Sequence, residues 1–284
     1  MSKAKMLRDL LKQEGVIMAP CAYDALSAKL IEMVGFKLIG TTGNGIHGDY
    51  LGTPDDGFMT LTEMTDVCRR MSNAVNIPVL ADAEAGYGNA LNTIRTIQEF
   101  ERAGVAGVFI EDQQLPPNCP FIKAPALITV DAMVGKIKAA IAARQDPDFL
   151  IVARCDAPFD EAIERAQAYI EAGADMIKIV PKTKKELELL PSKVNAPLHL
   201  GFVTGKPSHL GMTAFDAGKL GYKIVSFPQV VYYSAIKNQL ACLQEVLEKG
   251  CDEGVKDKMI DIETYHKIVE TEKYENYRHI FVKE

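Results

Sequence analysis

Eight short runs rich in β-branched and apolar residues recur along this chain, and longer stretches with helical periodicity separate them. Strands that alternate with helices form parallel sheets, because each helical crossover returns the chain to the same end of the sheet. Eight such units are the number that closes a (β/α)8, or TIM, barrel. We therefore predict an α/β barrel whose strands are residues 15–21, 38–42, 79–82, 107–111, 150–154, 176–180, 198–201 and 224–227.

The segments between these runs carry helix signals. Residues 93–102 place Ile94, Ile97 and Phe100 at helical spacing, with charged residues on the opposite face. Glycine is typical of the residue that ends a helix, and it stands just before the second, fourth, sixth and eighth runs at Gly35, Gly104, Gly173 and Gly221. An open doubly wound sheet is the alternative, but no GxGxxG fingerprint follows the first run.

The domain organisation and the partners follow from composition. No internal linker is evident, so residues 1–284 are predicted to form one barrel domain with a helical C-terminal extension, 253–284, which is either a decorating helix or an oligomer contact. A net charge of −6 argues against nucleic acid and anionic membrane as partners. We expect no membrane span, no signal peptide and a cytoplasmic location, with the six scattered cysteines reduced.

The segment 81–88, ADAEAGYG, follows a short apolar run and is the first candidate site. Residues i and i+2 of a strand point the same way, so Asp82 and Glu84 would reach one spot. Two carboxylates held that close repel each other unless a cation lies between them. The segment is either a cation site or a solvated strand end followed by a glycine turn.

Other charged residues end the neighbouring predicted strands. The C-terminal ends of the strands meet at one mouth of a parallel barrel, where active sites lie. Glu111 ends the fourth run, Arg154 ends the fifth, and Asp55 lies in the loop after the second. This pattern indicates a hard cation beside a carboxylate-binding site. Asp112 and Asp156 lie beside these residues at the same strand ends. The alternatives are that these two aspartates only cap turns and that Arg154 only neutralises the neighbouring acids.

Five segments match one family in order and spacing, and the chain resembles the isocitrate lyase / phosphoenolpyruvate mutase superfamily over nearly its whole length. The segments are 20–27 (PCAYDALS), 51–55 (LGTPD), 81–89 (ADAEAGYGN), 104–113 (GVAGVFIEDQ) and 153–157 (ARCDA). The resemblance implies a (β/α)8 barrel and a homotetramer in which the eighth helix is exchanged between subunits.

The resemblance also implies a metal site. At the matching positions, Asp82 would bind Mg²⁺ directly, with Mn²⁺ as the alternative ion. Asp55, Glu84 and Glu111 would hold the waters of that ion. Many relatives have aspartate at the position of Glu84, whereas isocitrate lyases have glutamate there.

A small-molecule carboxylate is the implied substrate. The backbone N–H groups of Thr42, Gly43 and Asn44 would hold the carboxylate of an oxoacid, and Arg154 would pair with it. Tyr23, after the first predicted strand, would line the pocket beside the metal. The metal would then stabilise an enolate of the pyruvate or glyoxylate type.

The loop after the fourth strand departs from the family. Carbon–carbon lyases of this family carry a Lys-Lys/Arg-Cys-Gly-His motif there, and this chain has PNCPF at 117–121. Cys119 is retained and would be the catalytic acid that protonates the leaving carbanion. Its basic neighbours, which would favour the thiolate and bind a second carboxylate, are absent. The alternative is that Cys119 is only an apolar filler.

Four further positions bear on the substrate. Val180 and Phe202 stand where the lyases have glutamate and asparagine, so we expect a substrate whose distal end is less charged than a tricarboxylate. His47 is either an acid–base group or a histidine on a solvent-facing loop, and the second is favoured. His199 faces the barrel mouth or is a core residue, and we favour the core.

The predicted function is that of an oxoacid lyase. We expect a Mg²⁺-dependent carbon–carbon lyase that cleaves a 2-hydroxy di- or tricarboxylate, of the methylisocitrate or dimethylmalate type, to pyruvate or a related 2-oxoacid. The alternatives are an oxaloacetate decarboxylase or hydrolase, a phosphonopyruvate-type P–C bond enzyme, and a non-catalytic barrel that only binds a small molecule.

Overall fold

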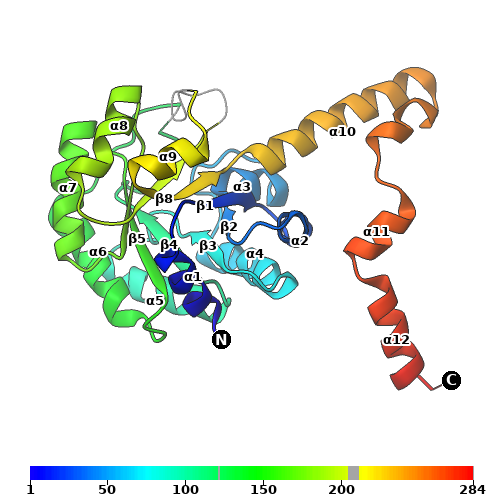
Figure 1. Cartoon of the computed structure of the whole chain (residues 1–284), viewed down its shortest axis with the longest axis horizontal. Helices are drawn as coiled ribbons and strands as arrows, with labels where there is room; N and C mark the ends of the chain where they lie inside the picture. Colours follow the sequence, from blue (N-terminus) through cyan, green and yellow to red (C-terminus); the bar gives the residue numbers. More distant parts are fainter. Residues whose placement is uncertain (121, 204–210, 284) are drawn as a thin grey trace. The chain divides into compact units, whose positions relative to one another are not determined.

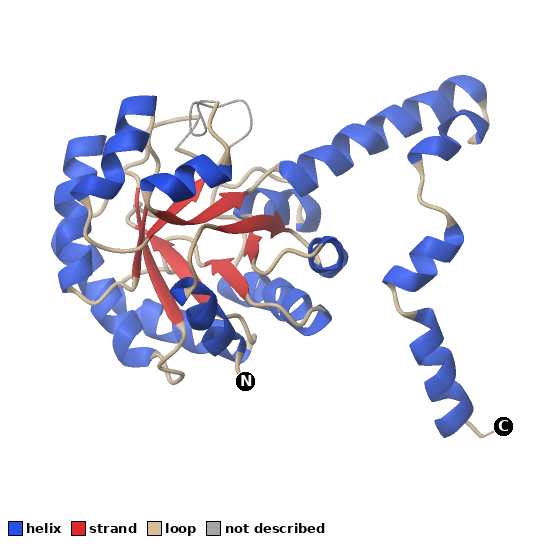
Figure 2. Ribbon diagram, viewed as in Figure 1, coloured by secondary structure: helices blue, strands red, loops and turns tan. Residues whose placement is uncertain are grey.

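Eight parallel strands close into a barrel in chain order, β1 to β8, in a computed structural model that describes residues 1–120, 122–203 and 211–283 (Figures 1 and 2). Phe121, in the predicted loop 117–121, lies outside the described residues. The predicted (β/α)8 barrel is confirmed. Its strands are β1 (Ile17–Ala22), β2 (Ile39–Thr41), β3 (Val79–Asp82), β4 (Gly107–Glu111), β5 (Leu150–Cys155), β6 (Met176–Ile179), β7 (Leu198–Gly201) and β8 (Tyr222–Phe227).

The helices of residues 3–220 pack around the barrel, and most of them connect successive strands (Figure 2). Two of them are additions to the repeating unit: α1 precedes β1, and α3 stands between β2 and α4. The helices are α1 (Lys3–Lys12), α2 (Ala25–Val34), α3 (Gly43–Tyr50), α4 (Leu61–Ala74), α5 (Ala90–Arg102), α6 (Val130–Ala143), α7 (Phe159–Glu171), α8 (Lys184–Lys193), α9 (Ala214–Leu220), α10 (Val230–Lys249), η1 (Glu253–Lys258), α11 (Ile262–Ile268) and α12 (Thr271–Phe281).

Apolar side chains fill two regions of the barrel. A large cluster packs the outer faces of the strands against the helices, with Phe100 and Tyr169 fully buried in it. A smaller cluster, which includes Leu80, Phe109 and Val152, fills the interior of the barrel. Because every strand is covered on both faces, polar side chains of the strands gather at the open mouth.

The helix ends follow the sequence signals. Asp24 begins α2 with a capping box, in which its carboxylate accepts a hydrogen bond from the N–H of Ser27 and the Ser27 hydroxyl accepts one from the N–H of Asp24. Gly35 ends α2 at a φ of 104°, and Gly221 ends α9 at 112°, a region that suits glycine because it lacks a Cβ.

The chain consists of two compact units, Met1–Val231 and Tyr232–Glu284. The first contains the barrel and the helices α1 to α9. The second contains most of α10 together with η1, α11 and α12. Many large apolar side chains of the second unit are exposed, among them Leu243, Leu247 and Phe281. Within the described part of the chain, no helix has the length and apolar character needed to cross a membrane.

Candidate active site

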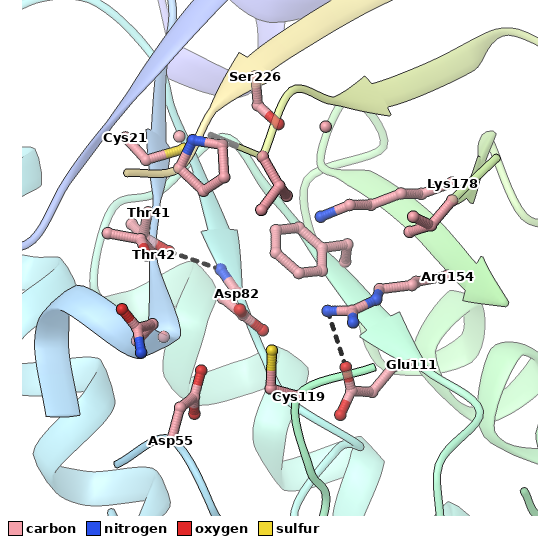
Figure 3. A pocket seen from close by; sticks show the side chains of 18 of the residues that line it. Cys21, Thr41, Thr42, Asp55, Asp82, Glu111, Cys119, Arg154, Lys178 and Ser226 are labelled. Carbon is pink, nitrogen blue, oxygen red and sulfur yellow. Dashed lines mark hydrogen bonds and ion pairs between the residues drawn. The ribbon is translucent and has the colours of Figure 1, made fainter. Parts of the chain in front are cut away.

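A pocket opens at the carboxyl ends of the barrel strands (Figure 3). All eight strands or the residues next to them contribute to its walls. Tyr23 packs against the apolar core and is not among the described residues that line this pocket. The other sequence-predicted site residues all line it, namely Thr42, Gly43, Asn44, Asp55, Asp82, Glu84, Glu111, Cys119 and Arg154.

Asp82 and Glu84 reach the pocket in different ways. Asp82 is the last residue of β3, and its N–H donates to Thr41 Oγ1 of β2 at 2.7 Å. Glu84 lies beyond the strand with a φ of 50°, a left-handed conformation that costs energy for a residue with a side chain. Its N–H donates to Asp82 Oδ1 at 2.9 Å. The prediction that both acids share one face of a strand is therefore wrong, although both line the pocket.

Three carboxylate oxygens converge beside Gly43. A methyl group at this glycine would lie 2.8 Å from Asp55 Oδ2 and 3.2 Å from both Asp82 Oδ2 and Glu84 Oε1. The glycine thus leaves open a small space that three acidic side chains surround. Oxygen atoms grouped in this way are the ligands that Mg²⁺ and Ca²⁺ prefer.

Burial makes this cluster electrostatically unfavourable without a cation. Burial, and next the charge of Asp82, raises the pKa of Asp55 to about 6. Burial and the charges of Asp55 and Asp82 also raise the pKa of Glu84 well above its ordinary value, and within the described residues no hydrogen bond reaches its buried Oε1. An added divalent cation would reverse these shifts, because it favours the ionised carboxylates. The residues therefore fit a bound metal.

His47 supports the cluster from behind. It is fully buried in α3, and its Nε2 accepts a hydrogen bond from the N–H of Met59 at 3.3 Å. Its Nδ1 therefore carries the proton, which it donates to the carbonyl of Gly43 at 2.9 Å, and the same atom lies 3.2 Å from Asp55 Oδ1. The prediction of a solvent-facing histidine is wrong, because His47 lies on the buried side of α3. Although its ring lies close enough to Asp55 and Glu84 to share a metal, both ring nitrogens are engaged.

Each of the three guanidinium nitrogens of Arg154 contacts a carboxylate. Its Nη1 lies 2.9 Å from Glu111 Oε2, across the β4–β5 pair. Its Nη2 and Nε lie 3.0 and 3.1 Å from the two oxygens of Asp156. Burial outweighs the attraction of Arg154 at Glu111 and raises the pKa of that carboxyl to about 8. The guanidinium therefore holds two acids in place at the mouth.

The loop that carries Cys119 is tied to the same network. Gln113 donates from Nε2 to Asp156 Oδ2 at 2.7 Å and accepts from the N–H of Asn118 at 2.8 Å. Cys119 is partly buried, and its sulfur is directed into the pocket near Asp82 (Figure 3). Sequence analysis did not predict this role of Gln113, which fixes the loop beside Arg154.

Helix α3 begins at the pocket wall. Thr42 is its N-cap and accepts a hydrogen bond from the N–H of Gly45 at 3.3 Å. The N-terminus of a helix presents backbone N–H groups and a positive dipole, which favour a carboxylate. The segment 42–44, which the resemblance assigned to the substrate carboxylate, thus forms a helix start with the required donors.

Three further polar side chains, Lys178, His199 and Ser226, line the pocket, and of these Lys178 and Ser226 were not predicted from the sequence. Lys178 Nζ lies 3.7 Å above the centre of the Phe109 ring, and burial, together with the charge of Arg154, lowers its pKa to about 8. His199 Nε2 lies 2.8 Å from Ser226 Oγ, and burial lowers the pKa of His199 well below its ordinary value. His199 is buried, as the favoured alternative required, but it also lines the pocket, so the other alternative, that it faces the barrel mouth, holds as well. A lysine within the apolar strand 176–179 was the available signal.

A TIM barrel with clustered carboxylates and a helix N-terminus at its mouth is an arrangement that suits an enzyme with a divalent metal beside an anionic substrate. The sequence profile of the phosphoenolpyruvate phosphomutase family matches residues 7–247. The chain therefore belongs to the phosphoenolpyruvate phosphomutase family, and the predicted superfamily is confirmed.

Relatives of known name include several lyases. The chain is 36% identical over 284 residues to 2,3-dimethylmalate lyase of Eubacterium barkeri, with 98% of both chains covered. It is 37% identical to 2-methylisocitrate lyase of Aeropyrum pernix, with 95% of this chain and 88% of the relative covered. It is 40% identical to an oxaloacetate decarboxylase of Bradyrhizobium diazoefficiens, with 77% of this chain and 76% of the relative covered. The prediction of an oxoacid lyase of this superfamily agrees with these names.

Solved structures share the whole fold. Phosphoenolpyruvate phosphomutase of Streptomyces platensis subsp. rosaceus superimposes with a TM-score of 0.92 at 30% identity, with 99% of both chains covered. Phosphonopyruvate hydrolase in complex with oxalate and Mg²⁺ superimposes with a TM-score of 0.90 at 28% identity, with both chains covered completely. One scaffold therefore accommodates enzymes with several names.

Proposed function

We propose that this protein is a metal-dependent carbon–carbon lyase that cleaves a 2-hydroxy dicarboxylate of the dimethylmalate kind to a 2-oxoacid. The observation that carries this proposal is the position of Cys119, whose sulfur is directed into the pocket that holds the carboxylate cluster. The relatives named as dimethylmalate and methylisocitrate lyases support the same reaction.

The proposed metal is Mg²⁺, with Mn²⁺ as the alternative. Asp82 would bind it directly, while Asp55, Glu84 and Glu111 would hold its waters. The oxygens around Gly43 support this assignment, because three of them face one small space. When bound, the metal would polarise the oxygens of the substrate and stabilise the negative charge that develops on them.

The chain's own groups would orient the substrate and move its protons. The N-terminus of α3, at Thr42, Gly43 and Asn44, would hold the carboxylate next to the 2-hydroxyl group. A carboxylate of the cluster would accept the hydroxyl proton as the hydroxyl becomes a carbonyl and the carbon–carbon bond breaks. Cys119 would donate its thiol proton to the carbon that leaves with the bonding electrons. Arg154 would hold Glu111 and Asp156 in place rather than meet the substrate alone.

An oxaloacetate decarboxylase or hydrolase, or a phosphonopyruvate-type enzyme, is the second candidate. The loss of the basic neighbours of Cys119 favours it, because those charges would bind a second carboxylate in the lyases. The relatives named as oxaloacetate decarboxylases add support. Dimethylmalate, oxaloacetate and phosphonopyruvate are supplied separately with Mg²⁺, and pyruvate, oxalate and phosphate are followed. The candidates differ in which of the three substrates is consumed and in which products appear from it.

We propose a homotetramer in which helices of the second unit are exchanged between subunits, and a cytoplasmic location. The exposed apolar side chains of Tyr232–Glu284 support the assembly, since such surface is stable in water when another chain covers it. The free cysteines, with no disulfide in the described part of the chain, are compatible with a reducing compartment.

Oxalate tests the metal-binding half of the site, because it resembles the planar oxoacid end of the substrate. We expect calorimetry to detect oxalate binding in the presence of Mg²⁺ and none without it. Asp82→Asn should abolish this binding, while Asp56→Asn, an exposed neighbour of Asp55, should leave it unchanged. Binding of oxalate that does not depend on the metal would contradict the proposed site.

Cys119→Ala tests the proton donor. We expect the turnover number on the true substrate to fall about 100-fold or more, the usual contribution of a general acid. Metal-dependent oxalate binding should persist, because the thiol acts on the other product. Cys251→Ala, at an exposed position in the second unit, is the matched control. Unchanged turnover of Cys119→Ala would show that another group supplies the proton.

A further inference from the structure

Lys178 occupies a central place in the wall of the pocket. In β6 it pairs in register with Arg154 of β5 on one side and with His199 of β7 on the other. All three residues line the pocket. Figure 3 shows the Lys178 side chain extending into the pocket, across from Asp55 and Thr42. The lysine therefore lies on the side opposite the carboxylate cluster and the start of α3.

Among the basic side chains of the pocket, Lys178 has its charge available for a ligand. Arg154 is engaged by Glu111 and Asp156 through three close contacts. His199 is bound to Ser226 and is held neutral by burial. For Lys178, no ion pair with an acidic residue is found in the part of the chain that the structure describes, and its nearest described aromatic contact is the face of Phe109.

The surroundings of Lys178 determine what it can bind. Phe109, Val180 and Val203 contribute apolar surface to the same pocket. An ammonium group beside apolar side chains attracts an anion more strongly than one in water, and the charges of Asp82 and Asp156 act on Lys178 without forming an ion pair with it among the described residues. A ligand that reaches from α3 to this side of the pocket would thus meet one positive charge and apolar walls at its distal end.

We propose that Lys178 binds the distal carboxylate of the substrate and so selects 2-hydroxy dicarboxylates, with Val180 and Val203 packing against aliphatic substituents between the two acid groups. This inference rests on the proposed function, since the proximal acid group must be held by the metal and α3. The ammonium group of Lys178 would supply a cation in place of the missing basic neighbours of Cys119. One lysine serves one distal carboxylate, so a tricarboxylate would leave its third charge unpaired.

Malate and 2-hydroxybutyrate form a matched pair of probes, because they share the 2-hydroxy acid end and differ in the distal carboxylate. With Mg²⁺ present, we expect calorimetry on the full-length protein to show malate binding about 10- to 100-fold more tightly, as for a charge-assisted contact. Lys178→Met should remove this preference while leaving the affinity for 2-hydroxybutyrate and oxalate unchanged. Lys178→Arg should retain part of the preference.

The control is Lys182→Met, a loss of the same charge at an exposed position, which should keep the wild-type preference. If the wild-type protein binds oxalate with Mg²⁺ but does not distinguish malate from 2-hydroxybutyrate, the proposal that Lys178 binds the distal carboxylate is wrong. The proposed metal site would not be contradicted by that result. The same conclusion follows if Lys178→Met keeps the preference. If the wild-type protein does not bind oxalate with Mg²⁺, the proposed function fails first.

Discussion

The contacts of Arg154 differ from those predicted from its sequence position. Its sequence position at the end of the fifth strand predicted a group for the substrate carboxylate. The structure places all of its nitrogens on Glu111 and Asp156. A buried arginine with two acidic partners contributes little net charge to a ligand. Its removal would leave two buried carboxylates unpaired, which is costly.

The raised pKa values of the acids predict how stability depends on pH. Asp55, at about 6, and Glu111, at about 8, bind protons in the folded protein that they release in the unfolded chain above about pH 5. These groups therefore lower the free energy of unfolding of the metal-free protein as the pH rises from 5 to 8. Mg²⁺ should raise the melting temperature more at pH 8 than at pH 5, because protons compete with it.

Thermal unfolding at both pH values, with Mg²⁺ and with a chelator, measures this effect. Asp56→Asn should behave like the wild-type protein, because Asp56 is exposed. Asp55→Asn should reduce the difference between the two pH values. An equal stabilisation by Mg²⁺ at pH 5 and pH 8 would count against a carboxylate site.

The pocket residues that could be predicted from the sequence are those that end a clear apolar run. Asp82 and Glu111 end apolar runs, so their positions at the barrel mouth followed from the strands alone. Glu84 reaches the pocket through a left-handed turn, which no strand periodicity describes. His47 was misplaced, because its burial depends on contacts with Asp55 and Met59 in the segment after α3, which the sequence pattern does not reveal. Lys178 interrupts an otherwise apolar strand, and a charged residue at such a position is a sequence signal for the barrel mouth.

At the level of elements, α3 is the addition that makes this barrel a candidate enzyme. The resemblance implied that the backbone of residues 42–44 holds a carboxylate, and no helix was predicted there. The structure instead begins a helix at Gly43, with Thr42 as its cap. The glycines serve close approach rather than flexibility, since Gly43 lies against three carboxylates. Helix propensity alone does not predict this helix, because two glycines in its first turn disfavour it.

Gly43→Ala tests this close approach. Its methyl group would come within 2.8 Å of Asp55 Oδ2 and 3.2 Å of Asp82 Oδ2, so the acids must move apart. We expect metal-dependent oxalate binding to be lost, as measured by calorimetry, while circular dichroism shows an intact fold.

The matched control is Gly135→Ala in α6, where the nearest atom to the new methyl group is 3.9 Å away. This change should raise the free energy of unfolding by about 0.5–1 kcal/mol, since alanine is the better helix former. Oxalate binding should be unchanged. Retained binding in Gly43→Ala would mean that the ligands adapt and that the space beside Gly43 is not needed.

At the scale of the whole molecule, the barrel was predictable because its signal repeats. Each of the eight predicted strands overlaps the observed one, and errors at single ends do not change the strand order. The second unit has no repeating strand and helix pattern of this kind. Residues 253–284 were predicted to be charged and helical, and η1, α11 and α12 lie within this range, with apolar side chains such as Ile280 and Phe281 exposed.

Helix α10 carries the last prediction. Leu240, Leu243 and Leu247 are spaced three and four residues apart, so they share one face, and all are more than 60% exposed. Surface of this kind is stabilised by burial against another copy of the chain. We expect light scattering to report a mass about four times the 31.2 kDa of one chain.

The double substitution Leu243→Glu and Leu247→Glu should lower that mass, because charges on this face oppose its burial. Ala241→Glu adds a charge on another face of α10 and should leave the assembly unchanged. A wild-type protein that is monomeric at micromolar concentration would contradict the proposed tetramer. The proposed metal site lies wholly within Met1–Val231, so oxalate binding would still test it on its own.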